Sequence, residues 1–510
     1  MDLKEKRILG GIFIIIFLLI FSSGSVFFFL LSGPDREDLD FRIRILSDSD
    51  FLEYGFPGNG SRENPYRIEN YTISTSQNHA ICIYYITKYI IIRNNDITAK
   101  RYGIYIYHVP PNHTHIENNV IHDCHYGIEI NYCPRSVIHN NTFYNNDFDI
   151  YLRLHSDHSI ITNNICYRNN GNSISNSRNA GVLFENNSVI FPKGFSSRNG
   201  IFLSSALNNS IRNNYFENCG LHISMEDFSY YHTLLIDNNY LNGEPFNYTV
   251  ILNKNGVLIN ATKCHQLDLV NCTNTEIFDG NFSSVDYGIF IRNCSATIIK
   301  ESLFKYIGAG IRTSLSKNTT IRNCNFMNSY RGIYTFIGFD ILITNCTFLN
   351  CPAGCYLVYS DAFVRNNTFK DNSIGCSFID CGYEPHIKAN GFLVDFNCTM
   401  TNNIFRNNTN GCLAKESICL IKDNTFWLSY VSLFMKGYDH IGYITNTTCN
   451  VINNHFRSNY ISIMMEFSEA QFIDNYIGNS TYGIYYSSDS YFSLFSVVFE
   501  DNDEDLYQYD

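Results

Sequence analysis

The feature that most constrains this chain of 510 residues is an internal repeat with a period of about 22 residues. The phrase Ile-X-Asn-Asn-X-Phe/Ile recurs over most of the chain, and in regular stretches it returns once in each repeat. A second phrase, Gly-Ile-X-Ile, keeps the same spacing. Within each run, apolar residues occupy every second position, which is the periodicity of β-strands rather than helices.

A coil of this length has too small an apolar face to fold alone, so successive coils must stack. A parallel β-helix does this, with Ile, Val, Leu and Phe facing a shared interior. The Asn pair falls between two strands, where Asn tolerates left-handed backbone and its amide can bond the backbone or the same Asn one coil away. The predicted turn residues are Asn94, Asn118, Asn140, Asn163, Asn213, Asn323, Asn345, Asn366 and Asn402.

The predicted fold class is all-β, a single-stranded right-handed parallel β-helix preceded by an N-terminal transmembrane helix. We expect a cytoplasmic N-terminus at 1–7, a transmembrane signal anchor at 8–31, and a linker with an N-terminal cap and first strands at 32–80. The β-helix repeats follow at 81–483, and a C-terminal cap with an acidic tail at 484–510. The repeat is interrupted at 239–278 and 367–401, and such interruptions in solenoids map to loops, often on the working face.

The N-terminal segment predicts the location of the protein. Lys4, Lys6 and Arg7 precede an apolar run at 8–31, which at ~1.5 Å per residue is long enough to span a ~30 Å bilayer. The basic residues before this run place the β-helix outside the cell. The alternative is a cleaved signal peptide and a secreted protein. Asn-X-Ser/Thr sequons recur throughout the chain and predict a glycoprotein.

The net charge of −12 argues against a nucleic-acid partner, because phosphate contact requires a basic face. The partners we expect are the membrane, through residues 8–31, and glycans or other surface proteins. Exposed tyrosines would offer ring faces to sugars.

Two stretches carry a family resemblance. Residues 55–68, reading GFPGNGSRENPYRI, precede the Asn-Asn and Gly-Ile coils, and together they resemble right-handed β-helix proteins of the pectin-lyase-like superfamily. Residues 243–294, with Gly256-Val257 and Asp286-Tyr287-Gly288-Ile289, resemble the β-helix domain of NosD. The resemblance implies the fold and NosD-like repeats over 81–483. Through NosD it also implies a role in assembling a metal centre, although many unrelated activities share this scaffold.

We expect no cofactor, and copper and calcium are the two metal ions to consider. Copper(II) sites contain grouped histidines, and the candidates are His113, His115, His122 and His125. The alternative is that these histidines are exposed residues on a turn-rich face.

The 18 cysteines include several pairs at one-coil spacing. Cys294 follows Cys272 after one repeat, and Cys376 follows Cys355 in the same way. Stacked cysteines of this kind are either buried packing residues or disulfides between coils.

Catalysis has one candidate segment. Tyr383, Glu384, His386 and Lys388 lie in the stretched interval 367–401 and loosely resemble a Tyr-Gly-X-Asp-Pro-His stretch of alginate C5-epimerases and lyases. That resemblance implies proton exchange by Tyr and His. None of the polygalacturonase signatures Asn-Thr-Asp, Asp-Asp and Gly-His-Gly occurs in the sequence. The alternative is a Pro-containing loop.

The function that we favour is a membrane-anchored extracellular β-helix that binds glycans or surface partners without catalysis. The first alternative is a carbohydrate-active polysaccharide lyase or C5-epimerase. A weaker alternative is a NosD-like accessory in metal-centre assembly. Whether the protein is an enzyme stays open.

Overall fold

The computed structural model describes residues 41–167, 171–193, 199–381, 398–440, 443–445 and 447–509. The predicted N-terminal segments at 1–7 and 8–31 lie outside these residues. Within the described ranges, no helix is long and apolar enough to cross a bilayer.

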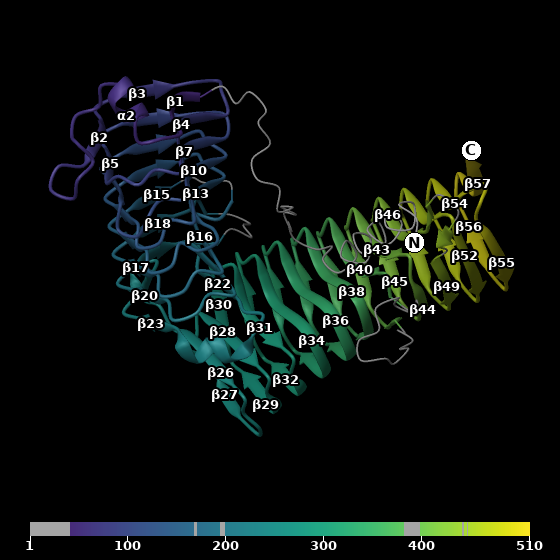
Figure 1. Ribbon diagram of the computed structural model, residues 1–510. Coiled ribbons are helices and arrows are strands. Elements are labelled where there is room, and N and C mark those ends of the chain that lie inside the picture. The colour runs from purple at the N-terminus through teal and green to yellow at the C-terminus, as the bar shows by residue number, and fades with distance from the viewer. Residues whose placement is uncertain are drawn as a thin grey trace, which may run out of the picture. The chain divides into compact units, whose positions relative to one another are not determined.

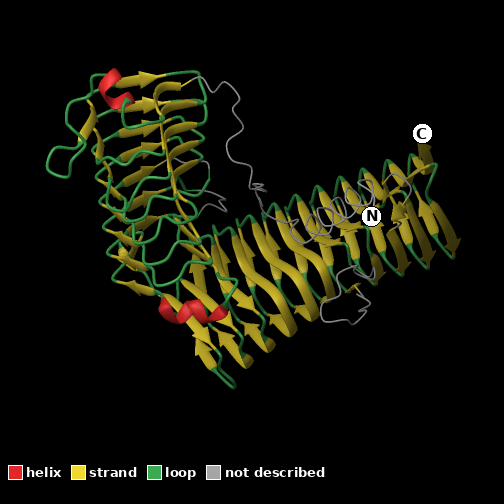
Figure 2. Ribbon diagram, viewed as in Figure 1, coloured by secondary structure: helices red, strands yellow, loops and turns green. Residues whose placement is uncertain are grey.

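The chain folds into a parallel right-handed β-solenoid of about 19 coils (Figures 1 and 2). The helical segments among the described residues are the short α2 (Asp50–Glu53) and the 3-10 helix η1 (Phe228–Thr233). The predicted all-β solenoid is therefore confirmed. Parallel pairing begins in β1 at Phe41, within the range expected to hold the first strands, and continues to β57 (Glu504–Tyr509), which pairs with β54 (Tyr482–Ser487). Residues 484–509 thus extend the stack.

The first coil series has three sheets. One runs from β2 (Tyr66–Glu69) to β23 (Leu235–Asp237), and another from β3 (Thr72–Ser74) to β25 (Glu244–Pro245). The third, the β1–β22 sheet, is parallel throughout. Its strands in order are β1 (Phe41–Ile45), β4 (His79–Tyr84), β7 (Tyr102–Tyr107), β10 (Tyr126–Asn131), β13 (Phe148–Leu152), β16 (Ile174–Ser177), β19 (Ile201–Ser204) and β22 (Leu221–Ser224).

The second coil series starts at β26 (Tyr248–Leu252) and forms a 20-stranded sheet and a 10-stranded sheet, the latter from β30 (Asn281–Ser283) to β56 (Val498–Glu500). Three long strands run through a corner of the coil and join two of its faces, which is why one sheet has 20 strands. They are β34 (Ala309–Arg322), β36 (Arg331–Thr344) and β38 (Ala353–Arg365). On the same sheet, β28 (Gln266–Val270) and β31 (Tyr287–Arg292) precede them.

The turns between strands depend on the left-handed backbone region. All nine predicted turn asparagines have φ between 53° and 57°. This region costs most L-residues free energy, whereas the short polar side chain of Asn bonds locally and reduces the cost.

The second Asn of each pair uses its side-chain amide to form hydrogen bonds with neighbouring coils. Nδ2 of the buried Asn164 donates to Oδ1 of Asn187 at 3.0 Å and to the carbonyl of Ile138 at 3.0 Å. The backbone N–H of Asn164 also donates to Oδ1 of Asn187. Repeated over neighbouring coils, these bonds form a buried amide ladder that satisfies the turn backbone. The second Asn thus forms the buried ladder, while the first adopts the left-handed backbone and can also bond its counterpart one coil away, as Asn140 does with Asn118 at 2.6 Å.

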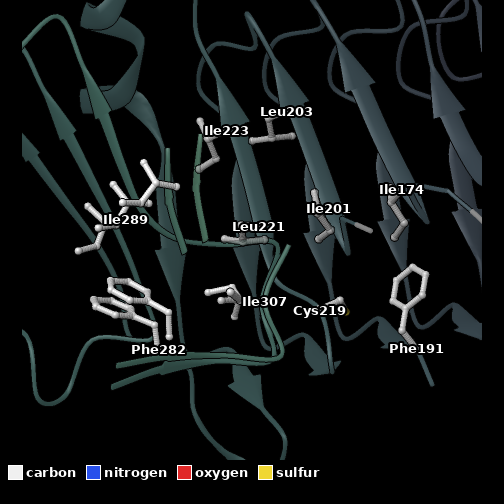
Figure 3. Packing of buried hydrophobic residues seen from close by; sticks show 14 of the residues in the cluster. Ile174, Phe191, Ile201, Leu203, Cys219, Leu221, Ile223, Phe282, Ile289 and Ile307 are labelled. Carbon is white, nitrogen blue, oxygen red and sulfur yellow. The ribbon is translucent and has the colours of Figure 1, made fainter. Parts of the chain in front are cut away.

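The interior is filled by inward-facing side chains that stack from coil to coil. A column of phenylalanines from Phe282 to Phe456 has successive ring centroids 4.7–5.0 Å apart. Figure 3 shows Leu221 and Ile223 of the first series close to Ile289 and Ile307 of the second, and all four belong to one hydrophobic cluster. The core is therefore continuous through the change of series.

The two interruptions of the repeat have different explanations. In the stretched interval, Val364 pairs directly with Met400 and Phe369 with Phe405, so the extra residues leave the coil without breaking the stack. The other interruption, at 239–278, contains the end of the first series and the start of the second.

Side chains, rather than another strand of the same sheet, continue the pairing beyond β22. Gln266 accepts from the N–H of Leu221 at 2.9 Å and donates to its carbonyl at 2.9 Å, so its amide imitates a neighbouring strand. Arg292 donates to the carbonyl of Ile223. Each bond pairs a buried backbone group that would otherwise be costly.

Candidate functional site

One column of outward-facing side chains on the 20-stranded sheet is rich in arginine and aromatic residues. In β31, β34 and β36, Ile289, Ile311 and Ile333 face inward and are buried. Because neighbouring side chains alternate in direction, the next residue of each strand faces outward. That outward column contains Phe290, Arg312, Tyr334 and Tyr356, which are paired in this order.

The guanidinium groups of this face lie against aromatic rings. Cζ of Arg312 is 4.7 Å from the ring centroid of Phe290 and 5.4 Å from that of Tyr334. Arg331, at the start of β36, is 4.7 Å from Tyr334, 4.6 Å from Tyr356 and 5.4 Å from Tyr330. We call Arg312, Tyr330, Arg331, Tyr334 and Tyr356 the arginine–tyrosine surface. Cation–π contacts fix the orientation of both guanidiniums.

No carboxylate forms a direct ion pair with the arginines of this surface among the described residues, although Asp286 interacts electrostatically with Arg312. Among the described residues, no carboxylate oxygen lies within 4.0 Å of Arg312 or Arg331. Burial and the neighbouring charge of Arg292 lower the pKa of Arg312. In a chain with a net charge of −12, the guanidinium of Arg331 therefore adds positive charge to this face without a carboxylate partner within 4.0 Å among the described residues.

A buried histidine adjoins the surface where the two coil series meet. Nδ1 of His222 is 2.7 Å from Oδ2 of Asp286, and Nη1 of Arg312 is 3.3 Å from Nε2 of His222. The arrangement fits a neutral imidazole that donates to Asp286 and accepts from Arg312. Burial lowers the pKa of His222, while its bond to Asp286 acts in the opposite direction.

A second cluster lies on the outer face of the β1–β22 sheet. Glu129 is 1% exposed, and its Oε1 accepts from Nη1 of Arg153 at 3.3 Å. Its Oε2 is buried and has no hydrogen-bond partner among the described residues. Burial raises the pKa of Glu129, and Arg153 acts against this rise. Tyr105 and Tyr151 are the paired residues on the two neighbouring strands, so the carboxyl group sits between two phenol rings.

A shallow cavity on one corner of the second series offers a further sugar-sized contact. It is lined by Asn407, Asn408, Thr409, Leu428, Ser429, Tyr430 and Ser458. Tyr430 is 56% exposed and stacks on Tyr460 with ring centroids 4.9 Å apart. Aromatic rings with polar neighbours are suited to sugars, which have both apolar faces and hydroxyl groups.

The four histidines considered for a metal have separate partners. His113 stacks on Tyr89, with ring centroids 3.7 Å apart, and His115 is on β8 (Thr114–Glu117), where burial lowers its pKa. His122 lies between Asp96 at 3.1 Å and Asp123 at 2.6 Å, and His125 bonds Asp147 at 2.5 Å. Over the described ranges, no three His, Cys, Asp or Glu side chains form a group that could hold a metal ion. Copper or calcium binding stays a prediction.

The remaining predictions concern the candidate catalytic segment and the cysteines. Tyr383, Glu384, His386 and Lys388 lie outside the described residues, so the candidate catalytic segment stays a prediction. All 18 cysteines are present as free thiols, and all but the half-buried Cys264 are buried.

Sequence reasoning missed the arginine–tyrosine surface, although a signal for it exists. Phe290, Arg312, Tyr334 and Tyr356 follow one another at intervals of one coil. From the sequence alone, outward Arg and Tyr are expected to be ordinary solvated positions. Their recurrence at one position of the repeat could have identified a column.

The chain resembles several solved structures at low sequence identity. They include the A-module of mannuronan C-5 epimerase AlgE4 from Azotobacter vinelandii, with 11% identity, coverage of 75% of this chain and 88% of that one, and a TM-score of 0.28. The PL6 family alginate lyase AlyGC has 9% identity and a TM-score of 0.29, and the match covers 86% of this chain and 85% of that one. PfbA, a surface adhesin of Streptococcus pneumoniae, has 13% identity and a TM-score of 0.28, and the match covers 81% of this chain and 83% of that one. Such values say nothing of function.

No curated protein matches the chain. The family described as right handed beta helix region matches residues 55–196 and 267–426, more than half of the chain. The interval between the two matches contains the junction of the two coil series. The solenoid and this match agree, and the chain belongs to the right-handed β-helix family.

Proposed function

We propose that this β-helix binds acidic glycans, without catalysis, through the arginine–tyrosine surface. The observation that carries the proposal is Arg331, whose guanidinium contacts three tyrosine rings and has no carboxylate partner within 4.0 Å among the described residues. A guanidinium pairs with a carboxylate or sulfate through two parallel hydrogen bonds. Of the adjacent tyrosines, Tyr330 is 40% exposed and offers a ring face to the sugar, whereas Tyr334 is buried. In this proposal, residues 8–31 anchor the protein in a membrane with the β-helix outside the cell.

The test is a binding measurement with the full-length protein in detergent. Uronate-containing oligosaccharides are compared with neutral oligosaccharides of the same length by isothermal titration. We expect binding of the acidic series only, and Arg331→Ala should weaken it at least tenfold, equivalent to about 1.4 kcal/mol. Arg322→Ala is the matched control, since Arg322 is an exposed arginine at the far end of β34. Equal binding of both series, or equal loss in both variants, would contradict the proposal.

A second candidate function, a polysaccharide lyase or C5-epimerase, is supported by Glu129. A carboxyl group whose pKa is raised by burial is suited to proton transfer near neutral pH. The test is incubation with uronate polymers and detection of unsaturated sugars or of inverted C5 centres. Product formation by the wild type and not by Glu129→Gln would support an enzyme. Identical traces for both variants and for a protein-free blank would exclude Glu129 catalysis on these polymers.

A further inference from the structure

Two cysteines at the start of the second coil series lie directly above one another. Cys272 follows β28 and Cys294 follows β31, and the flanking residues are paired in register, Val270 with Arg292 and Thr273 with Ser295. Neighbouring strands are ~4.8 Å apart, which is within the Cα separation that a disulfide bridges. The backbone N–H of Cys272 donates to Sγ of Cys294 at 3.3 Å.

The surroundings of this pair favour a thiolate on one of the two sulfurs. The hydrogen bond from Cys294 lowers the pKa of Cys272 and outweighs its burial, and backbone groups at Lys254 and Asn253 act in the same direction. As a neutral thiol, Cys272 donates to the carbonyls of Ile251 and Val270 at 3.3 Å. The same interaction raises the pKa of Cys294. The pair thus has one thiol disposed to attack and a second thiol in contact with it, the arrangement that supports disulfide exchange.

The pair is also near an end of the second stack. The coil that covers Cys272 is the first of its series, formed by β26 and β27 (Leu258–Asn260), and Leu258 in that coil is 67% exposed. Among the described residues, β26 and β27 have strand partners on the later side only, in β28 and β29, so this coil opens locally at a smaller free-energy cost than coils paired on both sides. A small reagent therefore reaches Cys272 through opening of one coil.

We propose that Cys272 and Cys294 form a reactive dithiol that a small-molecule disulfide oxidises to a cross-link between neighbouring coils. The thiolate of Cys272 attacks one sulfur of the reagent, whose S–S bond breaks and releases one thiolate. Cys294 then loses its proton and attacks Sγ of Cys272 in the mixed disulfide, and the second reagent thiol leaves. The two cysteines are oxidised, and the reagent is reduced to two thiols.

The other stacked cysteines provide an internal control. Cys398 and Cys419 are paired in register on adjacent strands, as are Cys355 and Cys376. Burial raises the pKa of both Cys398 and Cys419 well above the usual value. Buried neutral thiols are poor nucleophiles, so these internal columns should stay reduced under conditions that oxidise the terminal pair.

The experiment incubates the reduced full-length protein with oxidised glutathione near pH 7.5, quenches with acid and maps peptides by mass spectrometry. We expect loss of two hydrogen atoms and one cross-linked peptide pair containing Cys272 and Cys294. Cys294→Ser should accumulate glutathione on Cys272, whereas Cys272→Ser should give neither product. Cys398→Ser should behave as the wild type, and circular dichroism checks that each variant is folded.

Three outcomes would overturn the inference. The first is a folded protein in which every thiol stays free after incubation with glutathione disulfide. The second is a first cross-link between Cys398 and Cys419 or another internal pair. The third is glutathione on the half-buried Cys264 alone, which would mean that exposure rather than the paired geometry decides reactivity.

Discussion

Nδ1 of His222 lies 2.7 Å from Oδ2 of Asp286, although the two residues are far apart in the sequence. His222 belongs to the last strand of the β1–β22 sheet, and Asp286 immediately precedes β31 of the second series. Both are buried. Together with the pairing of Gln266 with Leu221, this bond holds the two coil series in contact by side chains where no strand of the β1–β22 sheet follows β22 among the described residues.

Removing this bond should destabilise the junction. Asp286→Ala removes the nearer partner of the buried Nδ1 of His222 and leaves only Asn199 at 3.2 Å, and we expect a loss of about 1–3 kcal/mol in the free energy of unfolding. Hydrogen exchange should report faster opening of β22 than of β10. Asp96→Ala is the control, because Asp96 pairs with His122 at 3.1 Å while 54% of its side chain is exposed. If both variants lose the same stability, the buried bond has no special contribution.

The two asparagines of one turn should respond differently to substitution. Asn164→Ala removes an amide whose Nδ2 serves Asn187 and the carbonyl of Ile138, so we expect a loss of about 1–3 kcal/mol in chemical denaturation. Asn163→Gly should change stability by less than about 1 kcal/mol, because Gly adopts its φ of 55° without strain. A larger loss for Asn163→Gly would show that the first Asn, rather than the ladder, stabilises the turn.

Glu129 should make stability depend on pH. Its pKa is raised in the folded state, so the contribution of Glu129 is fully present below its unfolded pKa of about 4.3 and is lost as pH rises through the folded pKa. Melting temperatures of wild type and Glu129→Gln are compared from pH 4 to pH 8. As pH increases, the melting temperature of the wild type should fall relative to that of Glu129→Gln, because Gln does not ionise. A difference that stays constant over this range would contradict the raised pKa.

Arg331→Lys distinguishes a positive charge from a shaped guanidinium. Lysine keeps the charge but cannot form two parallel hydrogen bonds or stack flat on Tyr334 and Tyr356. We therefore expect affinity for acidic oligosaccharides to fall several-fold, by roughly 1 kcal/mol, with a melting temperature close to that of the wild type. Isothermal titration calorimetry measures the affinity, and differential scanning calorimetry measures the melting temperature. Full retention of affinity would indicate simple charge attraction.

Local pattern accounts for most of the fold that could be predicted. The repeat determines which residues of each strand face inward, as with Ile289 and Ile311, because alternation within a strand is a property of neighbouring residues. The left-handed turns at residues such as Asn140 follow from the conformational tolerance of asparagine itself. One-coil spacing also placed Cys355 beside Cys376, where the structure pairs them.

The site depended on information that no local pattern holds. The first coil series ends where the second begins, and this junction decides which coils are in contact. It brings His222 next to Asp286 and Arg312. Whether an outward residue is solvated or partnered depends on its neighbours one coil away, as for Arg331 and Glu129. The sequence by itself determined the coil, its turns and its inward residues. Only the tertiary structure decided the junction, the buried carboxyl group and the lack of a carboxylate partner for Arg331 among the described residues, because burial and charge compensation arise from contacts between residues distant in the chain.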